Sequence, residues 1–257
     1  MIDVHSHILP DFDDGAKNTE VALAMLRESK KQGIDTVIST SHCYPRHSYV
    51  IDDFLHDRRL AFEELKAAME ESGEEPPEVR LGCELNLCRD ISDDDRLPLL
   101  CAEGTPYLLL EMPYTPWSEW HVEAVYKMTL RDDIIPVMAH IDRFLDQNKN
   151  LLNQLFELDV LYQVNAESFL VKQMTKGLDM LFDTGRIHFL GSDMHNMGDR
   201  KPNIGAAAEK IIKNYGEDHL RYLEENNRRL AAGEEIDAFG ARSLTKKTFF
   251  QRVFGKR

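Results

Sequence analysis

Short runs of apolar and β-branched residues alternate along the chain with longer amphipathic stretches, and this alternation restricts the fold more than any other feature. Parallel strands need long crossovers, usually helices, so the pattern is typical of βα units. We expect strands at Met1–His5, Asp35–Ser41, Glu78–Gly82, Tyr107–Met112, Ile134–Ala139, Val160–Asn165 and Ile187–Gly191. Helical patterns lie between them, for example Glu20–Lys31 and Asp52–Glu71. The 257 residues match the usual length of an α/β barrel.

Histidine and acidic residues follow six of the seven predicted strands. They are His5 and His7, His42, Glu84, Glu111, His140, and Asp193 with His195. Only the sixth strand, in YQVNAES, is followed by no obvious ligand. In a closed parallel barrel the carboxyl ends of the strands meet at one face, where Asp14 from the first loop would join them. Such a mixture of imidazoles and carboxylates predicts a divalent metal centre.

His5 and His7 stand at alternate positions at the end of the first predicted strand. A strand sends alternate side chains to the same face, so the two imidazoles would point together and form a pincer for a metal ion. The alternative is that they are two polar residues at the mouth of a loop. The ligand-type residues after the other strands favour the metal.

Composition limits the class of protein. The formal net charge is −14, which argues against a nucleic-acid backbone as the main partner. Hydrophobic residues make up 42%, but no apolar stretch is long enough to cross a membrane, and the start of the chain lacks the pattern of a signal peptide. The four cysteines form no regular framework, which agrees with a reducing compartment. We therefore expect a cytoplasmic protein.

These residues resemble the polymerase-and-histidinol-phosphatase (PHP) superfamily of metal-dependent phosphoesterases. More narrowly, they are similar to the bacterial protein-tyrosine phosphatases of capsular and exopolysaccharide gene clusters. The matching stretches are MIDVHSHILPDFDDGAK, the TSH after the second strand, GCEL, LLLEMP, PVMAHIDRF, YQVNA and GSDMHNMGDRKP. The resemblance implies a distorted TIM-like (β/α)7 barrel, the PHP fold, over residues 1–236.

The resemblance also implies a cluster of three divalent ions. His5, His7, Glu84 and Asp193 would hold one ion. Glu84 would bridge to a second ion, completed by Glu111 and His140, and Asp14, His42 and His195 would hold the third. The ligands suit Mn, Fe or Zn, with Mn preferred by the resemblance. A hydroxide bridging the metals would attack the phosphate.

Arg143 and Arg200 follow predicted ligands closely, three residues after His140 and five after His195. A guanidinium group binds two phosphate oxygens at once, and both arginines match family positions that clamp the phosphate. The alternative is a pair of surface salt bridges. We expect both to act in catalysis.

The implied activity is hydrolysis of phosphotyrosine in proteins, with a cognate bacterial tyrosine kinase that controls polysaccharide export as the substrate. One alternative is a small-molecule phosphatase on the same barrel, such as a histidinol-phosphate phosphatase. A second is a non-catalytic PHP module with a binding or regulatory role, although no ligand position is missing. Members of the family associate, but no stretch of this chain indicates an interface.

Residues 237–257 form a basic, aromatic tail. From 240 onwards it has no acidic residue, whereas Lys246 and Lys247 lie beside Phe249 and Phe250. Contact with an anionic membrane surface or an acidic partner would suit this composition. Fraying, or docking on the chain's own domain, is the alternative.

Cys83 to Arg89, CELNLCR, satisfies C-x5-R, the signature of cysteine-dependent tyrosine phosphatases. Their loop wraps the phosphate with backbone N–H groups and is rich in glycine, because the backbone must approach the anion closely. This stretch has no glycine and would point the Glu84 carboxylate at the phosphate. We interpret the match as accidental. Aromatic residues near the predicted mouth (Tyr44, Tyr49, Tyr114, Trp117 and Trp120) are interpreted as core or lid residues rather than substrate contacts.

Overall fold

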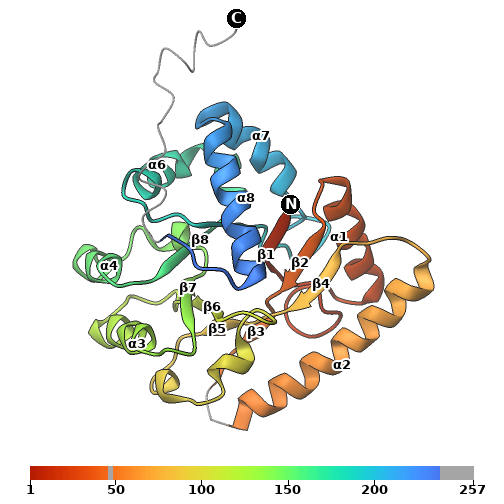
Figure 1. Ribbon diagram of the computed structural model, residues 1–257, viewed down its shortest axis with the longest axis horizontal. Coiled ribbons are helices and arrows are strands. Elements are labelled where there is room, and N and C mark those ends of the chain that lie inside the picture. The colour runs from red at the N-terminus through yellow and green to blue at the C-terminus, as the bar shows by residue number, and fades with distance from the viewer. Residues whose placement is uncertain (46–48, 238–257) are drawn as a thin grey trace, which may run out of the picture.

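The computed structural model describes residues 1–45 and 49–237, in which the strands lie at the centre and the helices surround them (Figure 1). The strands are β1 Ile2–Ser6, β2 Thr36–Ser39, β3 His42–Cys43, β4 Glu78–Leu81, β5 Glu84–Asn86, β6 Tyr107–Glu111, β7 Ile135–Met138, β8 Leu161–Asn165 and β9 Phe189–Gly191. The α-helices are α1 Thr19–Lys31, α2 Tyr49–Ser72, α3 Glu119–Thr129, α4 Lys149–Phe156, α5 Ala166–Leu170, α6 Thr175–Asp183, α7 Ile204–Asn214 and α8 Glu217–Ala232. The 3-10 helices are η1 Ile91–Asp93, η2 Leu97–Leu100, η3 Ile141–Phe144 and η4 Lys172–Met174.

The paired strands of the described residues are all parallel. They form two sheets that close on each other. One sheet has the order β1-β2-β4 and the other the order β3-β5-β6-β7-β8-β9. At one junction the Asp193 N–H donates to the His5 carbonyl (2.8 Å), which joins the end of β9 to β1. At the other junction the Glu84 N–H donates to the Thr40 carbonyl (2.9 Å). The two sheets therefore make one barrel.

The predicted fold class is confirmed, and the barrel is distorted at two places. Five of the predicted strands appear as β1, β6, β7, β8 and β9. The predicted second and third strands, Asp35–Ser41 and Glu78–Gly82, appear as the shorter β2 and β4, and each is followed by a further short strand that was not predicted, β3 and β5. At Gly82, between β4 and β5, an added Cβ would lie only 3.0 Å from a methyl group of Ile38. The breaks directly precede His42 and Glu84, so the irregular backbone sets the direction of two predicted ligands.

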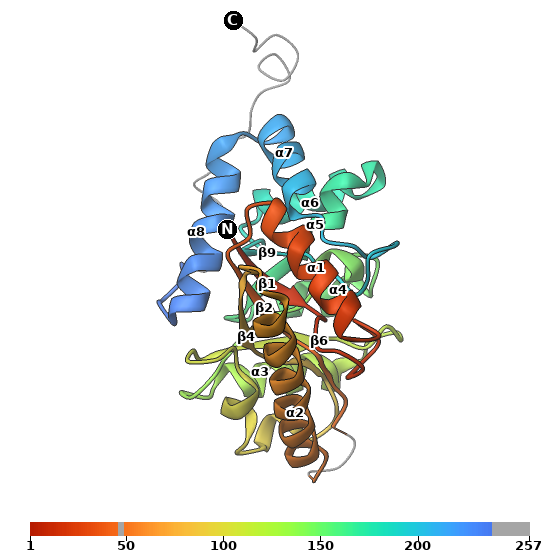
Figure 2. The ribbon, with the colours of Figure 1, turned by 90° about the vertical axis from the view of Figure 1, so that its right-hand side faces the viewer.

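The helix α8 closes the amino-terminal end of the barrel. Its Asn227 side chain donates to the Ile2 carbonyl at the start of β1 (2.8 Å), and Figure 2 shows α8 beside that end of the strand. The buried residues packed inside the barrel include Val4, Leu109, Val137, Leu161, Phe189, Leu230 and Ala231. Because the amino-terminal end is filled in this way, polar groups are left to gather at the carboxyl end.

A second apolar layer lies between the strands and the surrounding helices, as a βα barrel requires. The helix α1 shows how local sequence sets the boundaries. The Asn18 side chain caps its first turn by accepting from the Val21 N–H (2.9 Å), and Gly33, with φ of +79°, follows its last turn. Among the described helices, none has both the length and the apolar character needed to cross a membrane.

Candidate metal centre

The nine predicted ligands lie together at the carboxyl ends of the barrel strands. In each of these side chains, a nitrogen or oxygen atom lies 2.9–3.6 Å from a nitrogen or oxygen atom of another predicted ligand. The set comprises His5, His7, Asp14, His42, Glu84, Glu111, His140, Asp193 and His195. The convergence predicted from the strand ends is therefore present.

His5, His7, Glu84 and Asp193 form the inner group. The Nε2 atoms of His5 and His7 are 3.3 Å apart, and they lie 3.2 and 3.3 Å from Glu84 Oε2. Asp193 Oδ1 lies 3.5 and 3.6 Å from the same two nitrogens. Ligands of a tetrahedral ion at bond lengths of about 2.1 Å are about 3.4 Å apart. The four side chains are at most 1% exposed.

Glu84 also belongs to a middle group with Glu111 and His140. Its second oxygen, Oε1, lies 2.9 Å from His140 Nε2, and Glu111 Oε1 lies 3.6 Å from the same nitrogen. The two oxygens of Glu84 thus face different groups of side chains. This is the arrangement that a carboxylate bridging two ions requires.

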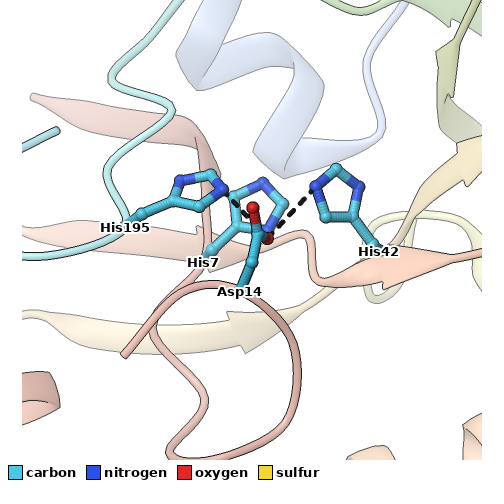
Figure 3. A group of neighbouring side chains, drawn as sticks. All are labelled: His7, Asp14, His42 and His195. Carbon is cyan, nitrogen blue, oxygen red and sulfur yellow. Dashed lines mark ion pairs between the residues drawn. The ribbon is translucent and has the colours of Figure 1, made fainter. Parts of the chain in front are cut away.

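Asp14, His42 and His195 form the outer group, shown with His7 in Figure 3. Asp14 Oδ1 lies 3.4 Å from His42 Nε2 and 3.2 Å from His195 Nε2. The His7 ring lies between the two, with its centroid 4.5 Å from that of His42 and 3.9 Å from that of His195. Unlike the inner group, this one reaches solvent, because the Asp14 side chain is 61% exposed.

The geometry around Glu84 fits metal binding better than hydrogen bonding. Both its oxygens are buried and accept no hydrogen bond of acceptable geometry from the described residues. Yet four imidazole nitrogens, from His5, His7, His42 and His140, lie within 3.3 Å of them. Close approach without a donated hydrogen is expected of atoms that are ligands of a shared cation. A buried carboxylate left without a partner would be costly.

Two histidines of the centre have a raised pKa because of nearby carboxylates, whereas a third has a lowered pKa. Burial alone would lower the pKa of His7, but the Asp13 and Glu84 carboxylates outweigh it and raise the pKa to about 10. For His140, burial is likewise outweighed by Glu111 and Glu84, and the pKa rises to about 9. Burial and the neighbouring His7 instead lower the pKa of His195 to about 3. His195 is therefore neutral at pH 7, with a lone pair free for a ligand.

Both predicted arginines reach the centre from its mouth, and each side chain is 30% exposed. Arg143 lies in η3 and its Nη2 is 2.7 Å from Asp193 Oδ2. Arg200 Nη2 is 2.7 Å from the other oxygen, Oδ1. The loop after β9 brings Arg200 back toward the centre, because the Arg200 carbonyl accepts from the His195 N–H (2.8 Å). They are not isolated surface salt bridges.

Sequence reasoning missed several residues that contact the predicted ligands. Asp13 is one: its Oδ2 lies 2.8 Å from His7 Nδ1 and accepts from the His42 N–H (3.0 Å). Its place beside Asp14 in FDDG was the available signal. Two more are Gln163 and Asn165 of β8, the strand without a predicted ligand, and both are buried. Their alternation on one strand face was the signal there.

The C-x5-R match is not a phosphate-binding loop. Its middle residues form the strand β5, and the buried Cys83 thiol has its pKa raised well above the usual value by burial. Arg89 lies over the Trp120 ring, 4.8 Å from its centroid. The stretch contributes Glu84 to the centre instead.

Two of the aromatic residues near the mouth are at its surface. Tyr44 is 50% exposed with its ring 5.1 Å from that of His42, and Tyr114 is 60% exposed and accepts from Arg143 Nη1 (3.0 Å). Trp117 is a buried core residue, as expected, and Trp120 packs against the core while partly buried. The Tyr49 side chain lies outside the described part of the chain. Tyr44 and Tyr114 thus flank the centre on two sides.

The family model described as capsular polysaccharide synthesis, CpsB/CapC, matches residues 1–231. The chain belongs to the CpsB/CapC family. It is 28% identical over 243 residues to the tyrosine-protein phosphatase CpsB of Streptococcus agalactiae, covering 87% of this chain and 94% of that protein. It is 29% identical over 248 residues to the tyrosine-protein phosphatase YwqE of Bacillus subtilis, covering 92% and 93%.

The structural comparison agrees with this family. A crystal structure from work on YwqE of Bacillus subtilis and CpsB of Streptococcus pneumoniae, described as unique metal-dependent tyrosine phosphatases, matches with a TM-score of 0.76. The identity is 27%, and the match covers 92% of this chain and 96% of that chain. Over nearly the whole of this chain, the fold is therefore shared with a metal-dependent enzyme of the family.

Proposed function

We propose that this protein is a metal-dependent protein-tyrosine phosphatase. In this proposal its physiological substrate is a phosphorylated cognate tyrosine kinase that regulates polysaccharide synthesis or export, and it acts in the cytoplasm. The observation that carries the proposal is a complete set of nine ligand-type side chains, with two arginines, at the mouth of a CpsB/CapC-family barrel.

The inner, middle and outer groups would hold three divalent ions, with Mn the preferred metal and Fe or Zn also suited to the same donors. Glu84 would belong to both the inner and the middle site. When bound, such ions activate water at neutral pH and neutralise charge on phosphate oxygens. The raised pKa values of His7 and His140 support this assignment, because they reflect an excess of buried negative charge that cations would balance.

Arg143 and Arg200 would bind the non-bridging oxygens of the phosphate. Their guanidinium groups approach the centre from the open side, where a substrate must enter. Tyr114, hydrogen-bonded to Arg143, would hold that arginine in place. The leaving tyrosine phenolate has a pKa of about 10, so its departure demands little help from a general acid.

The surroundings of the centre favour a polypeptide substrate over a small molecule. A hollow of about 620 Å³, lined by residues that include Phe12, His42 and Tyr44, opens beside the outer group. A second hollow of about 570 Å³ lies on the other side and is lined by residues that include Tyr114, Arg143 and Met174. Open hollows on both sides would accept the chain that flanks a phosphotyrosine.

The test is hydrolysis of a phosphotyrosyl peptide by protein stripped with a chelator and then resupplied with Mn, Zn or Fe. We expect activity to vanish on stripping, return with metal, survive in Cys83→Ser and fail in His42→Ala. Activity that ignores the chelator and is lost in Cys83→Ser would overturn the proposal. Hydrolysis of small phosphate esters alone would instead favour the histidinol-phosphate type, and inactivity on every ester would favour a regulatory module.

A further inference from the structure

The strand β8 carries no predicted ligand, yet two of its side chains contact ligands from three other segments. We propose that Gln163 and Asn165 are positioning residues that hold His5, His140 and Asp193 in the form that binds metal. The inference rests on the proposed function only in requiring a metal at the centre. It does not depend on which phosphate ester is hydrolysed.

The orientation of the Gln163 amide follows from two backbone groups whose roles are certain. The His140 N–H donates to one end of the amide at 2.7 Å, so that end is the carbonyl oxygen Oε1. The other end donates to the Val164 carbonyl at 2.8 Å, so it is the Nε2 amino group. A flipped amide would place donor against donor and acceptor against acceptor.

This orientation assigns the tautomer of His5. Its Nδ1 lies 3.1 Å from Gln163 Oε1, which has no hydrogen to donate. His5 Nδ1 must therefore carry the hydrogen, and in the neutral ring the lone pair is on Nε2. Nε2 is the atom that faces Glu84 and Asp193, at 3.2 and 3.5 Å. Gln163 thus selects the tautomer that can bind a metal at the inner group.

Asn165 extends the same hydrogen-bond chain to Asp193. Its Oδ1 accepts from Gln163 Nε2 at 2.9 Å, and its Nδ2 then donates to Asp193 Oδ2 at 2.8 Å. This contact directs Asp193 Oδ1 toward the nitrogens of His5 and His7. Oδ2 is held by Asn165 together with Arg143, whereas Oδ1 faces the inner group and also accepts from Arg200 Nη2.

The backbone around these contacts is unusual, which makes support by β8 necessary. His140 and Asp193 have φ of +30° and +54°, in the left-handed region that residues other than glycine seldom adopt. Gln163 accepts from the backbone of His140, and Asn165 holds the side chain of Asp193. At Gly191 an added Cβ would lie 2.5 Å from His5 Cβ and 2.9 Å from Gln163 Nε2, so only glycine permits their close approach.

A neutral amide suits this position better than the carboxylate that often supports a metal-binding histidine. All four hydrogen bonds that the Gln163 amide can make are formed, two donated and two accepted. A glutamate at 163 would face the Val164 carbonyl and Asn165 Oδ1 with an oxygen instead of a donor. It would also add a charge next to Asn165, which contacts the buried Asp193 carboxylate.

The first test needs no substitution at β8. Protein labelled with ¹⁵N-histidine and loaded with Zn²⁺ is examined by NMR, and the His5 signals are identified by their absence in His5→Gln. We expect His5 to show a hydrogen on Nδ1 that exchanges slowly with water. A His5 ring that binds Zn²⁺ through Nδ1, or whose Nδ1 hydrogen exchanges as fast as that of an exposed histidine, would overturn the assignment.

The second test compares Zn²⁺ dissociation constants, measured by competition with a chelator, in Gln163→Met, Gln163→Glu, Asn165→Leu and Asn227→Ala. Loss of a supporting hydrogen bond typically weakens metal binding about 10–100-fold, and we expect this for the three β8 variants. Asn227→Ala removes a buried amide at the far end of the barrel, so it should lower Tm while leaving Zn²⁺ affinity within about twofold. β8 variants that bind Zn²⁺ as tightly as the wild type would contradict the inference. Neither test measures hydrolysis, so a protein that does not hydrolyse phosphotyrosine would contradict the proposed function without changing the result of either test.

Discussion

The inner and outer groups of the centre use the same ligand types but are held very differently. The inner group is buried, and the Nδ1 atom of each of its histidines has a hydrogen-bond partner outside the group. The partner of His7 is Asp13, and the partner of His5 is Gln163. In the outer group, Asp14 is 61% exposed and its contacts are with other groups of the centre itself, His42, His195 and Arg200. In the proposed assignment the inner ligands are in position before an ion binds, whereas Asp14 of the outer group would be ordered by the ion itself.

This difference has a consequence for the order of binding. Preorganised ligands lose little conformational freedom when an ion binds, whereas an exposed aspartate must be ordered at that moment. We therefore expect the inner and middle sites to bind tightly and the outer site to exchange its ion readily.

Glu84→Gln is expected to have the largest effect, because Glu84 is shared by the inner and middle groups. In the proposed assignment its carboxylate bridges two ions, so replacing it with an amide would remove a charge and an anionic ligand from both sites. We expect kcat/KM on a phosphotyrosyl peptide to fall by about 10³-fold or more, with fewer ions retained by elemental analysis. The matched control is Glu123→Gln on the surface of α3, which should change neither quantity.

Asp14→Asn is expected to cost less and to remove only the outer ion. We expect a loss of about 10²-fold in kcat/KM that is partly restored by excess metal, since His42 and His195 remain. Elemental analysis after gel filtration should show the inner and middle ions still bound. Asp132→Asn, which is also exposed but lies outside the centre and its hollows, serves as control. Loss of all ions in Asp14→Asn would show that the groups are not independent.

Arg143→Lys and Arg200→Lys should have smaller effects, because a lysine keeps the charge but cannot bind two phosphate oxygens at once. We expect kcat/KM to fall about 10-fold in each, with metal content unchanged. Arg89→Lys is the informative control, since Arg89 completes the C-x5-R match but stacks on Trp120. A larger loss in Arg89→Lys than in the other two would contradict the assignment of the phosphate site.

The fold and the convergence of the candidate ligands could be predicted from the sequence because both depend on local pattern. Each strand is a short apolar run, and in a parallel barrel the residue after a strand must lie at one face, whatever the details of packing. The barrel breaks before His42 and Glu84 could not be predicted, since nothing in the local pattern indicates the close approach of Ile38 to Gly82. The predicted tail 237–257 lies, apart from its first residue, outside the described residues.

The supporting residues were harder to predict because their roles depend on contacts distant in sequence. Gln163 meets His5 across 158 positions, and nothing in YQVNAES indicates that partner. An amide or carboxylate behind a ligand has the composition of an ordinary buried polar residue. Only the contact with a ligand nitrogen distinguishes it, and this contact exists only once the barrel is closed.

We expect the stability of metal-free protein to distinguish His7 and His140 from His195 by the sign of its pH dependence. The folded-state pKa values of His7 and His140, about 10 and 9, lie above the ordinary value of about 6.5. The stability that these two histidines contribute is therefore fully present below about pH 6.5 and is lost as the pH rises through 9 to 10. For His195, with a pKa of about 3, the contribution is present above about pH 6.5 and is lost as the pH falls toward 3.

Urea unfolding of chelator-treated protein from pH 5 to pH 10 measures the free energy of unfolding along both limbs of this profile, the alkaline limb and the acid limb. We expect the free energy of unfolding to fall by about 2 kcal/mol or more on the alkaline side, and also to fall on the acid side. His140→Gln should flatten the alkaline limb, because it removes one of the groups with a raised pKa. His195→Gln should flatten the acid limb alone. Limbs that respond equally to both substitutions would mean that His140 and His195 titrate as one unit, and the contrast between them would not hold.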